Sequence, residues 1–235
     1  MNTKYVVFAD DLLRMFTFSS RDETRYYLGG VNLRPATKGV FLEASDGSRA
    51  GLLKMDTGIA PDSGAPLIVS GDKNVIATLK RREKIKSLHW AVIDPEAQRL
   101  SIVVANESTE ALVPEKSREI ASVANALIVD GVFPNLGNVL PTKVAVAISG
   151  PICINPLLLA DFAKMSNEKT VHTVLFNDAN NDDLLAHQRA MIIRVSGRPD
   201  FVGVLMPAKS VYTLDEALPR WLPKKPPKDV ADKAA

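Results

Sequence analysis

Residues 24–50 constrain the fold more than any other stretch of the sequence. Apolar side chains recur at strand-like spacing along residues 26–33 and again along residues 39–44, and turn-forming residues separate them at Pro35, Gly39, Asp46 and Gly47. Alternation interrupted in this way is typical of antiparallel strands, because glycine and aspartate tolerate the backbone angles that tight turns need. The stretch therefore predicts a β-meander, which by itself is a common scaffold and indicates no function.

A strand, a helix and a meander recur about three times, starting near residues 5, 67 and 152. We expect Asp10 and Asp11 to cap a first helix that ends near Phe18, and Asp72 to cap a second over residues 73–84. Asn155 followed by Pro156 predicts a third helix that ends near residue 166. The other predicted strands lie at residues 66–70, 88–93, 99–105, 144–148, 171–176, 190–195 and 201–206, and residues 120–129 fit a strand or a helix. This order predicts a loose internal repeat.

Composition excludes several classes of protein. The chain has 235 residues, 46% of them hydrophobic, which suffices for one large or two small domains. A formal net charge of +2 excludes binding to nucleic acid through a highly basic tail. The lone Cys153 excludes an intrachain disulfide and every multi-cysteine zinc module. Because there is neither a signal-peptide core nor an apolar run as long as a membrane helix, we expect a cytoplasmic protein that does not bind membranes.

The sequence shows no catalytic constellation. The three histidines lack metal-ligand spacing, and there is neither a phosphate-binding glycine loop nor a nucleophile elbow. Asp178, Asp182 and Asp183 share a loop with three asparagines, but the glycine and glutamate of an EF-hand loop are missing, which favours a solvated turn. We therefore expect no cofactor, no metal and no enzymatic activity. An enzyme on an unrelated sheet scaffold, with residues 178–183 as a metal site, is one alternative.

The predicted second helix separates apolar from basic side chains. At about 100° per residue, Val75, Ile76 and Leu79 share one side, whereas the basic residues share another. The basic residues are Lys73, Lys80 and Lys84, with Arg81 beyond them. Taken alone, such a face is most often a solvated surface.

Three ordered motifs resemble the bacterial DNA polymerase sliding clamp, the beta subunit. Residues 25–31 read RYYLGGV and are followed by SDGSR at residues 45–49; both are similar to the second domain of that family. Residues 128–141 read IVDGVFPNLGNVLP and are similar to the I-D-G-x-F-P-x-x-x-x-V-L-P segment of that family. Residues 204–207 read VLMP and are similar to the V-V-M-P segment near the end of a clamp chain. The resemblance covers roughly residues 4–210. It implies an α+β fold of the DNA-clamp type, with antiparallel sheets outside and helices on the inner face.

The resemblance also implies a double-stranded DNA interface. Lys73 matches the channel lysine of the family, and Arg25 and Tyr26 match its R-Y-Y motif. Lys80, Arg81 and Lys84 have no motif match and are assigned to the same interface by helix geometry. Such contacts would be sequence-nonspecific and salt-sensitive, because they meet phosphates rather than base edges.

A peptide groove is the second implied site, through which clamps hold the short clamp-binding motif of DNA polymerases and the clamp loader. The matching positions come from five segments of the chain. They are Leu28, Ser45, Gly47, Arg49, Pro134, Val139, Asn155, Leu158, Val204, Leu205, Met206 and Pro207. The chain departs from the family at Ser48, Ala50 and residues 136–138, so the groove is expected to prefer a different peptide or to hold none.

Clamp rings of this family carry six similar domains, and this chain has at most two. We assign residues 1–142 to a clamp-like domain, residues 143–212 to a second, abbreviated one, and residues 213–235 to a disordered tail rich in proline and lysine. A ring would then be a homo-oligomer, with three copies expected. A truncated clamp-like interaction protein that binds clamp partners without encircling DNA is the other alternative.

Overall fold

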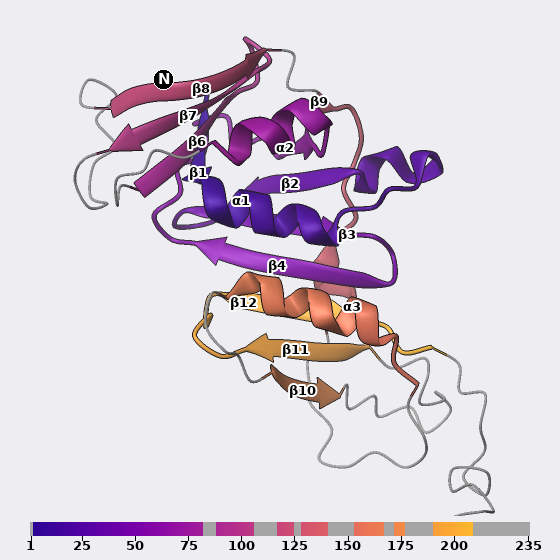
Figure 1. The fold of residues 1–235 in the computed structure, drawn as a ribbon. Helices are drawn as coiled ribbons and strands as arrows, with labels where there is room; N and C mark the ends of the chain where they lie inside the picture. The colour runs from indigo at the N-terminus through magenta and orange to yellow at the C-terminus, as the bar shows by residue number, and fades with distance from the viewer. Residues whose placement is uncertain are drawn as a thin grey trace, which may run out of the picture.

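The computed structural model describes residues 2–81, 88–105, 117–124, 128–140, 153–166, 172–176 and 190–208 (Figure 1). Several expectations lie outside these residues: the strand at 144–148, the acidic loop at 178–183, Lys84 and the tail. Within the described residues the chain forms two antiparallel sheets, and its helices lie on one side of the larger sheet (Figure 1). The predicted α+β architecture of antiparallel sheets with helices on one face is confirmed.

Three units follow one another along the chain, each with a helix followed by three strands. The first unit contains β1 (Tyr5–Phe8), α1 (Ala9–Met15), the 3-10 turns η1 (Phe16–Phe18) and η2 (Glu23–Leu28), β2 (Gly30–Pro35), β3 (Val40–Ser45) and β4 (Arg49–Met55). The second contains β5 (Leu67–Ser70), α2 (Lys73–Leu79), β6 (Leu88–Asp94), β7 (Arg99–Ala105) and β8 (Ser117–Ala124). The third contains α3 (Pro156–Ala160), η5 (Asp161–Met165), β10 (His172–Phe176), β11 (Met191–Val195) and β12 (Phe201–Leu205). Two short elements, β9 (Ile128–Val129) and η4 (Leu136–Asn138), lie between the second and third units.

The sheets join these units in a fixed order. The smaller sheet has the strand order β1-β6-β7-β8, and the larger has the order β10-β11-β12-β4-β3-β2-β5-β9. The strands β1 and β5, which open the first two units and are called leading strands below, each pair with the meander of the other unit. The third meander extends the first, because β12 pairs with β4.

Local sequence explains where the helices begin. The Asp72 carboxylate accepts from the Asn74 backbone N–H at 2.7 Å, and the Asn155 amide oxygen accepts from the Leu157 N–H at 3.0 Å. Both predicted caps are confirmed, and Pro156 occupies the first turn of α3. The predicted cap of α1 is wrong, because its cap is Phe8. Asp10 and Asp11 lie in the first turn, where the positive end of the helix dipole stabilises their carboxylates.

Two further expectations need correction. Tyr26 and Tyr27 lie in η2 rather than in a strand, and β2 begins only at Gly30. The side chain of Asp22 accepts from the Thr24 backbone N–H at 3.0 Å and so starts this turn, a capping signal that the strand-like spacing concealed. The helix α2 ends at Leu79, with Lys80 as its cap, which is earlier than expected from the sequence.

The described part of the chain contains no helix with the length and apolar character that crossing a membrane would require.

The first and third units meet at two glycines. Gly51 of β4 lies directly opposite Gly203 of β12, and the rings of Phe18, Phe162 and Phe201 cover this pair on the helix side. A Cβ at Gly203 would lie 2.2 Å from the Phe162 ring, and one at Gly51 would lie 2.9 Å from the Phe18 ring. The aromatic rings thus fill the space that missing side chains leave, as aromatic residues do over glycines in other sheets.

We expect Gly203→Ala to lower the free energy of unfolding by about 2 kcal/mol, because the new methyl group overlaps the Phe162 ring. In a Phe162→Leu background the same substitution should cost much less, which a double-mutant cycle of denaturant unfolding measures. Equal costs in both backgrounds would contradict this account of the joint.

Candidate nucleic-acid interface and peptide groove

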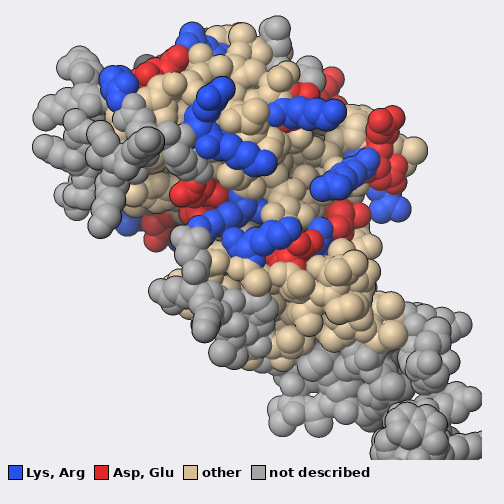
Figure 2. Space-filling model, viewed as in Figure 1, with Lys and Arg blue, Asp and Glu red and all other residues tan. Residues whose placement is uncertain are grey.

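Basic side chains spread across the face on which the helices lie (Figure 2). On α2, Val75 and Leu79 are buried, whereas Lys73 at its start and Lys80 at its end are exposed, as is the following Arg81. The predicted separation of apolar and basic sides is therefore present in the described part of this helix. Ammonium and guanidinium groups held on such a face are suited to phosphates.

Three cations that the sequence reasoning missed lie on the same side. A cavity of about 840 Å³ lies between α1, α2 and η5, and it is lined by Arg14, Arg21 and Lys164 together with Lys80. Arg14 follows buried Leu12 on α1, so the helical geometry applied to α2 could have found it. Arg21 and Lys164 carry no sequence signal, because only the fold brings η5 beside α1.

Arg25 and Tyr26 lie in η2, where both are exposed. The Arg25 guanidinium lies against Gly47, whose φ of +88° requires glycine, and its Nε is 3.8 Å from the Asp22 carboxylate. The Tyr26 ring contacts the Tyr27 ring edge-on and has 58% of its surface exposed. Both predicted DNA contacts are thus accessible to a ligand.

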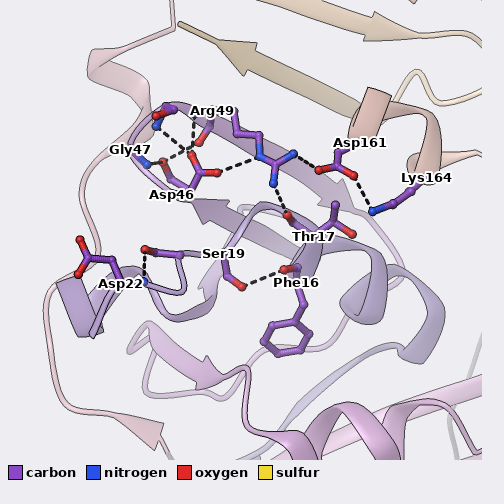
Figure 3. Close-up of polar contacts among 12 residues, drawn as sticks. Phe16, Thr17, Ser19, Asp22, Asp46, Gly47, Arg49, Asp161 and Lys164 are labelled. Atoms are coloured by element: carbon purple, nitrogen blue, oxygen red, sulfur yellow. Dashed lines mark hydrogen bonds and ion pairs between the residues drawn. The ribbon is translucent and has the colours of Figure 1, made fainter. Parts of the chain in front are cut away.

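Arg49 is held in a network of ion pairs at the wall of the helix-side cavity, which Asp46 and Asp161 also line (Figure 3). Its side chain is only 9% exposed; Nε lies 3.0 Å from Asp46, one terminal nitrogen pairs with Asp161, and the other donates to the Thr17 carbonyl at 2.9 Å. Lys164 pairs with the same Asp161 carboxylate at 2.5 Å. Since Arg49 belongs to β4 and Asp161 to η5, the network ties the third unit to the first.

Partial burial alone would raise the pKa of the Asp161 carboxyl, but hydrogen bonds from Lys164 and Arg49 outweigh that effect and lower the pKa below its usual value.

Two more arginines contribute to the contact between the first and third units. Arg14 donates to the Met165 carbonyl at 3.1 Å, and Arg198 reaches both that carbonyl and Asp11, the latter at 2.9 Å. The Arg14 bond to Met165 and the Arg198 pair with Asp11 both cross between the first and third units.

The turn between β3 and β4 lies where the sequence predicts it and is closed by several hydrogen bonds. The Ser45 hydroxyl donates to the Arg49 carbonyl at 2.8 Å and accepts from the Gly47 N–H at 3.1 Å. Ser48 and Arg49 donate backbone N–H groups to Asp46. The Met206 N–H donates to the Ser48 carbonyl at 2.8 Å, which fixes the chain after β12 beside this turn.

The predicted groove residues divide between the two faces of the sheet. Val204 forms an apolar cluster with Ala50, Leu136 and Ala190 on the face away from the helices, whereas Leu205 belongs to the main core on the other face. The remaining members differ in exposure: Leu28 and Pro207 are buried, Leu158 is half-buried against the main core, and Pro134, Val139, Asn155 and Met206 are exposed. Leu136 was not among the predicted residues, but the apolar spacing of Phe133, Leu136 and Leu140 could have found it.

No single cavity gathers the predicted groove within the residues that the structure describes. A cavity of about 960 Å³ lies over β2, β3 and β5 and is lined by residues 128–135, of which Pro134 is the only predicted member. Val139 precedes Leu140, which packs on the Val204 cluster, and Met206 follows Val204 by two residues; their side chains are 45% and 38% exposed. These two offer an apolar edge to an extended peptide.

The described ranges contain no group of three or more histidine, cysteine, aspartate or glutamate side chains that converge on a possible metal site.

Comparison with solved structures identifies the fold. The chain is similar to the DNA polymerase III beta subunit of Thermotoga maritima, with a TM-score of 0.57 and 14% identity over 88% of this chain and 66% of that one. The DNA polymerase sliding clamp of Caulobacter crescentus gives a TM-score of 0.56 at 16% identity, covering 89% and 66%, and that of Pseudomonas aeruginosa gives 0.51 at 15%, covering 88% and 67%. The chain thus has the sliding-clamp fold and spans about two thirds of the length of these clamps. No family model and no curated protein matches it.

Replacing Arg49 with alanine should cost about 3 kcal/mol of unfolding free energy, because Asp46 and Asp161 lose a nearly buried partner. Arg99→Ala is the matched control: the Arg99 side chain is 46% exposed and its pair with Glu119 lies at the surface, so its loss should cost less than about 1 kcal/mol. Chemical denaturation of both variants compares the two costs. Similar costs would show that Arg49 does not hold the third unit in place.

Proposed function

We propose that this chain is a subunit of a DNA sliding clamp, a non-enzymatic processivity factor that encircles duplex DNA and tethers replication proteins. The observation that carries the proposal is the accumulation of exposed cations on the helix side of a sliding-clamp fold.

The cations belong to different units but share one side of the molecule. Lys73 and Lys80 come from α2, Arg14 from α1 and Lys164 from η5. Lys80, Arg14 and Lys164 line one cavity. They would contact phosphates along the duplex without reading bases, which permits sliding. The ring would be a homo-oligomer in the cytoplasm, with no cofactor.

The opposite face would recruit partners. Val139 and Met206 are exposed beside the filled Val204 cluster, so a leucine or phenylalanine of an extended peptide could rest on them. The partners of this edge would be a DNA polymerase and a clamp loader that carry a clamp-binding motif. Because Leu136 belongs to the apolar cluster, the edge is shallower than an open groove and should bind short motifs weakly.

Binding of fluorescent duplex DNA across a range of salt concentrations tests the interface. The double substitution Lys73→Ala and Lys80→Ala should weaken binding equally for unrelated sequences and reduce the salt slope by about 1 per lysine. Lys54→Ala is the control, because Lys54 is exposed on β4 at a position that alternates with core residues Leu53 and Met55 and so lies on the helix-free face.

Equal weakening by Lys54→Ala would contradict a DNA-binding helix face. A chain that is monomeric at micromolar concentration and binds a clamp-binding peptide but no DNA would favour the second candidate, a truncated clamp-like interaction protein. That candidate is consistent with the span of about two thirds of a clamp chain.

A further inference from the structure

The cavity over β2, β3 and β5 has a polar floor on the helix-free face of the larger sheet. Asn32 of β2 lies directly opposite Glu43 of β3. Both alternate with core residues along their strands, which places them on the face away from the helices. The leading strand β5 extends this row with Ile68, opposite Asn32, and all three side chains line the cavity of about 960 Å³. Only 5% of Asn32 and 4% of Glu43 is exposed, so the floor consists of buried polar groups rather than solvated ones.

This floor is balanced in charge but leaves one acceptor unused. Glu43 accepts from the Asn32 amide at 2.7 Å and from two nitrogens of Arg34, at 3.2 and 2.6 Å. The Arg34 guanidinium also lies 4.5 Å from the centre of the Phe41 ring, which holds it beside Glu43. The side-chain oxygen of Asn32 accepts no hydrogen bond from the part of the chain that the structure describes. Because a buried oxygen without a donor is costly, this atom is suited to an N–H group of a ligand.

Hydrogen bonds fix one wall of the cavity. At the start of the leading strand β1, the Tyr5 hydroxyl donates to the Ala65 carbonyl at 2.5 Å. The Asn2 backbone N–H donates to the Asp62 carboxylate at 2.7 Å, and the Asp62 N–H donates to the Asn2 carbonyl at 2.8 Å. The loop at residues 61–66 is thereby tied to the N-terminal segment. A wall that is already ordered loses little conformational entropy when a ligand binds.

The remaining charged residues make the cavity acidic. Its charged lining residues are Arg34, Glu43, Asp62, Glu96 and Asp130. Because Arg34 and Glu43 form an ion pair, the other three, all carboxylates, set the net charge. Glu96 lies in the turn between β6 and β7, and Asp130 follows β9. The cavity therefore attracts a cation and repels the phosphates of DNA.

Apolar side chains lie beside these carboxylates. Val132 is 90% exposed, and Pro95 and Pro134 line the same cavity. Pockets that combine apolar walls with a few fixed polar groups are typical of ligand sites, and a volume of about 960 Å³ is near the upper limit for a small ligand. The space is thus sufficient for a long side chain together with its neighbours in a peptide.

We propose that this cavity binds an arginine side chain carried by an extended segment of a partner protein. The guanidinium donates to the unused Asn32 oxygen, Glu96 and Asp130 balance its charge, and apolar neighbours of the arginine rest on Val132. Arginine fits this site better than lysine because its weakly hydrated guanidinium carries five N–H donors in one plane. It can therefore bond to the floor and to a carboxylate at the same time.

The site is separate from both sites of the proposed function. Val139 and Met206 do not line this cavity, and Lys73 and Lys80 belong to α2, on the other face of the sheet. The inference goes beyond the proposed function and does not depend on it, because a cationic partner can bind here whether or not the chain encircles DNA.

Fluorescence anisotropy with a labelled peptide tests the site in the full-length chain. The probe is alanine-leucine-arginine-leucine-alanine, blocked at its C-terminus, and the matched peptide carries citrulline, which keeps the shape of arginine without its charge. The double substitution Glu96→Gln and Asp130→Asn should weaken binding of the arginine peptide about fivefold, because each exposed charge pair contributes little by itself. Val132→Ser should also weaken it, through the loss of apolar contact.

The matched control is Glu23→Gln, since Glu23 is exposed in η2 and does not line the cavity. This substitution should leave the affinity unchanged, and the citrulline peptide should bind more weakly than the arginine peptide. Equal weakening by Glu23→Gln, equal affinity for the two peptides, or no binding of the arginine peptide would overturn the inference. Duplex binding that depends on Lys73 and Lys80 in the same preparation would show that the proposed function survives such a failure. Peptide binding without duplex binding would remove the function and keep the arginine site.

Discussion

The antiparallel pairing of β4 with β12 determines how the rest of the molecule is arranged. It joins the meanders of the first and third units, which are far apart in sequence, within one eight-stranded sheet that also contains β5 and β9. The two strands can approach at this spacing because Gly51 and Gly203 lie opposite each other beneath three phenylalanine rings. On the helix side, the buried Arg49 links Asp46 to Asp161. Since η5 is thereby fixed beside α1, the cations of three different segments share one face.

The sequence predicted what depends on short-range chemistry. Asp72 and Asn155 cap their helices, β6 and β7 lie at the predicted residues 88–93 and 99–105, and the threefold repetition of helix and meander is present. Errors arose where one local signal competed with another: the spacing of Tyr26 and Tyr27 resembled a strand, but the Asp22 cap starts a 3-10 turn there. No local signal indicated which meanders pair, because strand exchange is a long-range choice.

The candidate sites likewise combine residues that local sequence predicts with residues that only the fold brings together. The basic side of α2 follows from helical geometry, so Lys73 and Lys80 could be found, whereas Lys164 joins them only through the fold. Arg49 was assigned to a peptide groove by motif, and the structure surrounds it with carboxylates between two units. The motif gave the position of Arg49 in the sequence, but one of its partners, Asp161, lies more than a hundred positions away in the chain. Of the apolar residues assigned to that groove, Val139 and Met206 are exposed.

The central claim is that the helix side of this fold lines the opening of a closed ring of several copies. Electron microscopy of the purified chain, classified without imposed symmetry, tests it most directly. The account predicts ring-shaped particles with a central opening, in which Lys73 and Lys80 face inward once the chain is fitted. Solitary compact particles, or rings in which these lysines face outward, would contradict it.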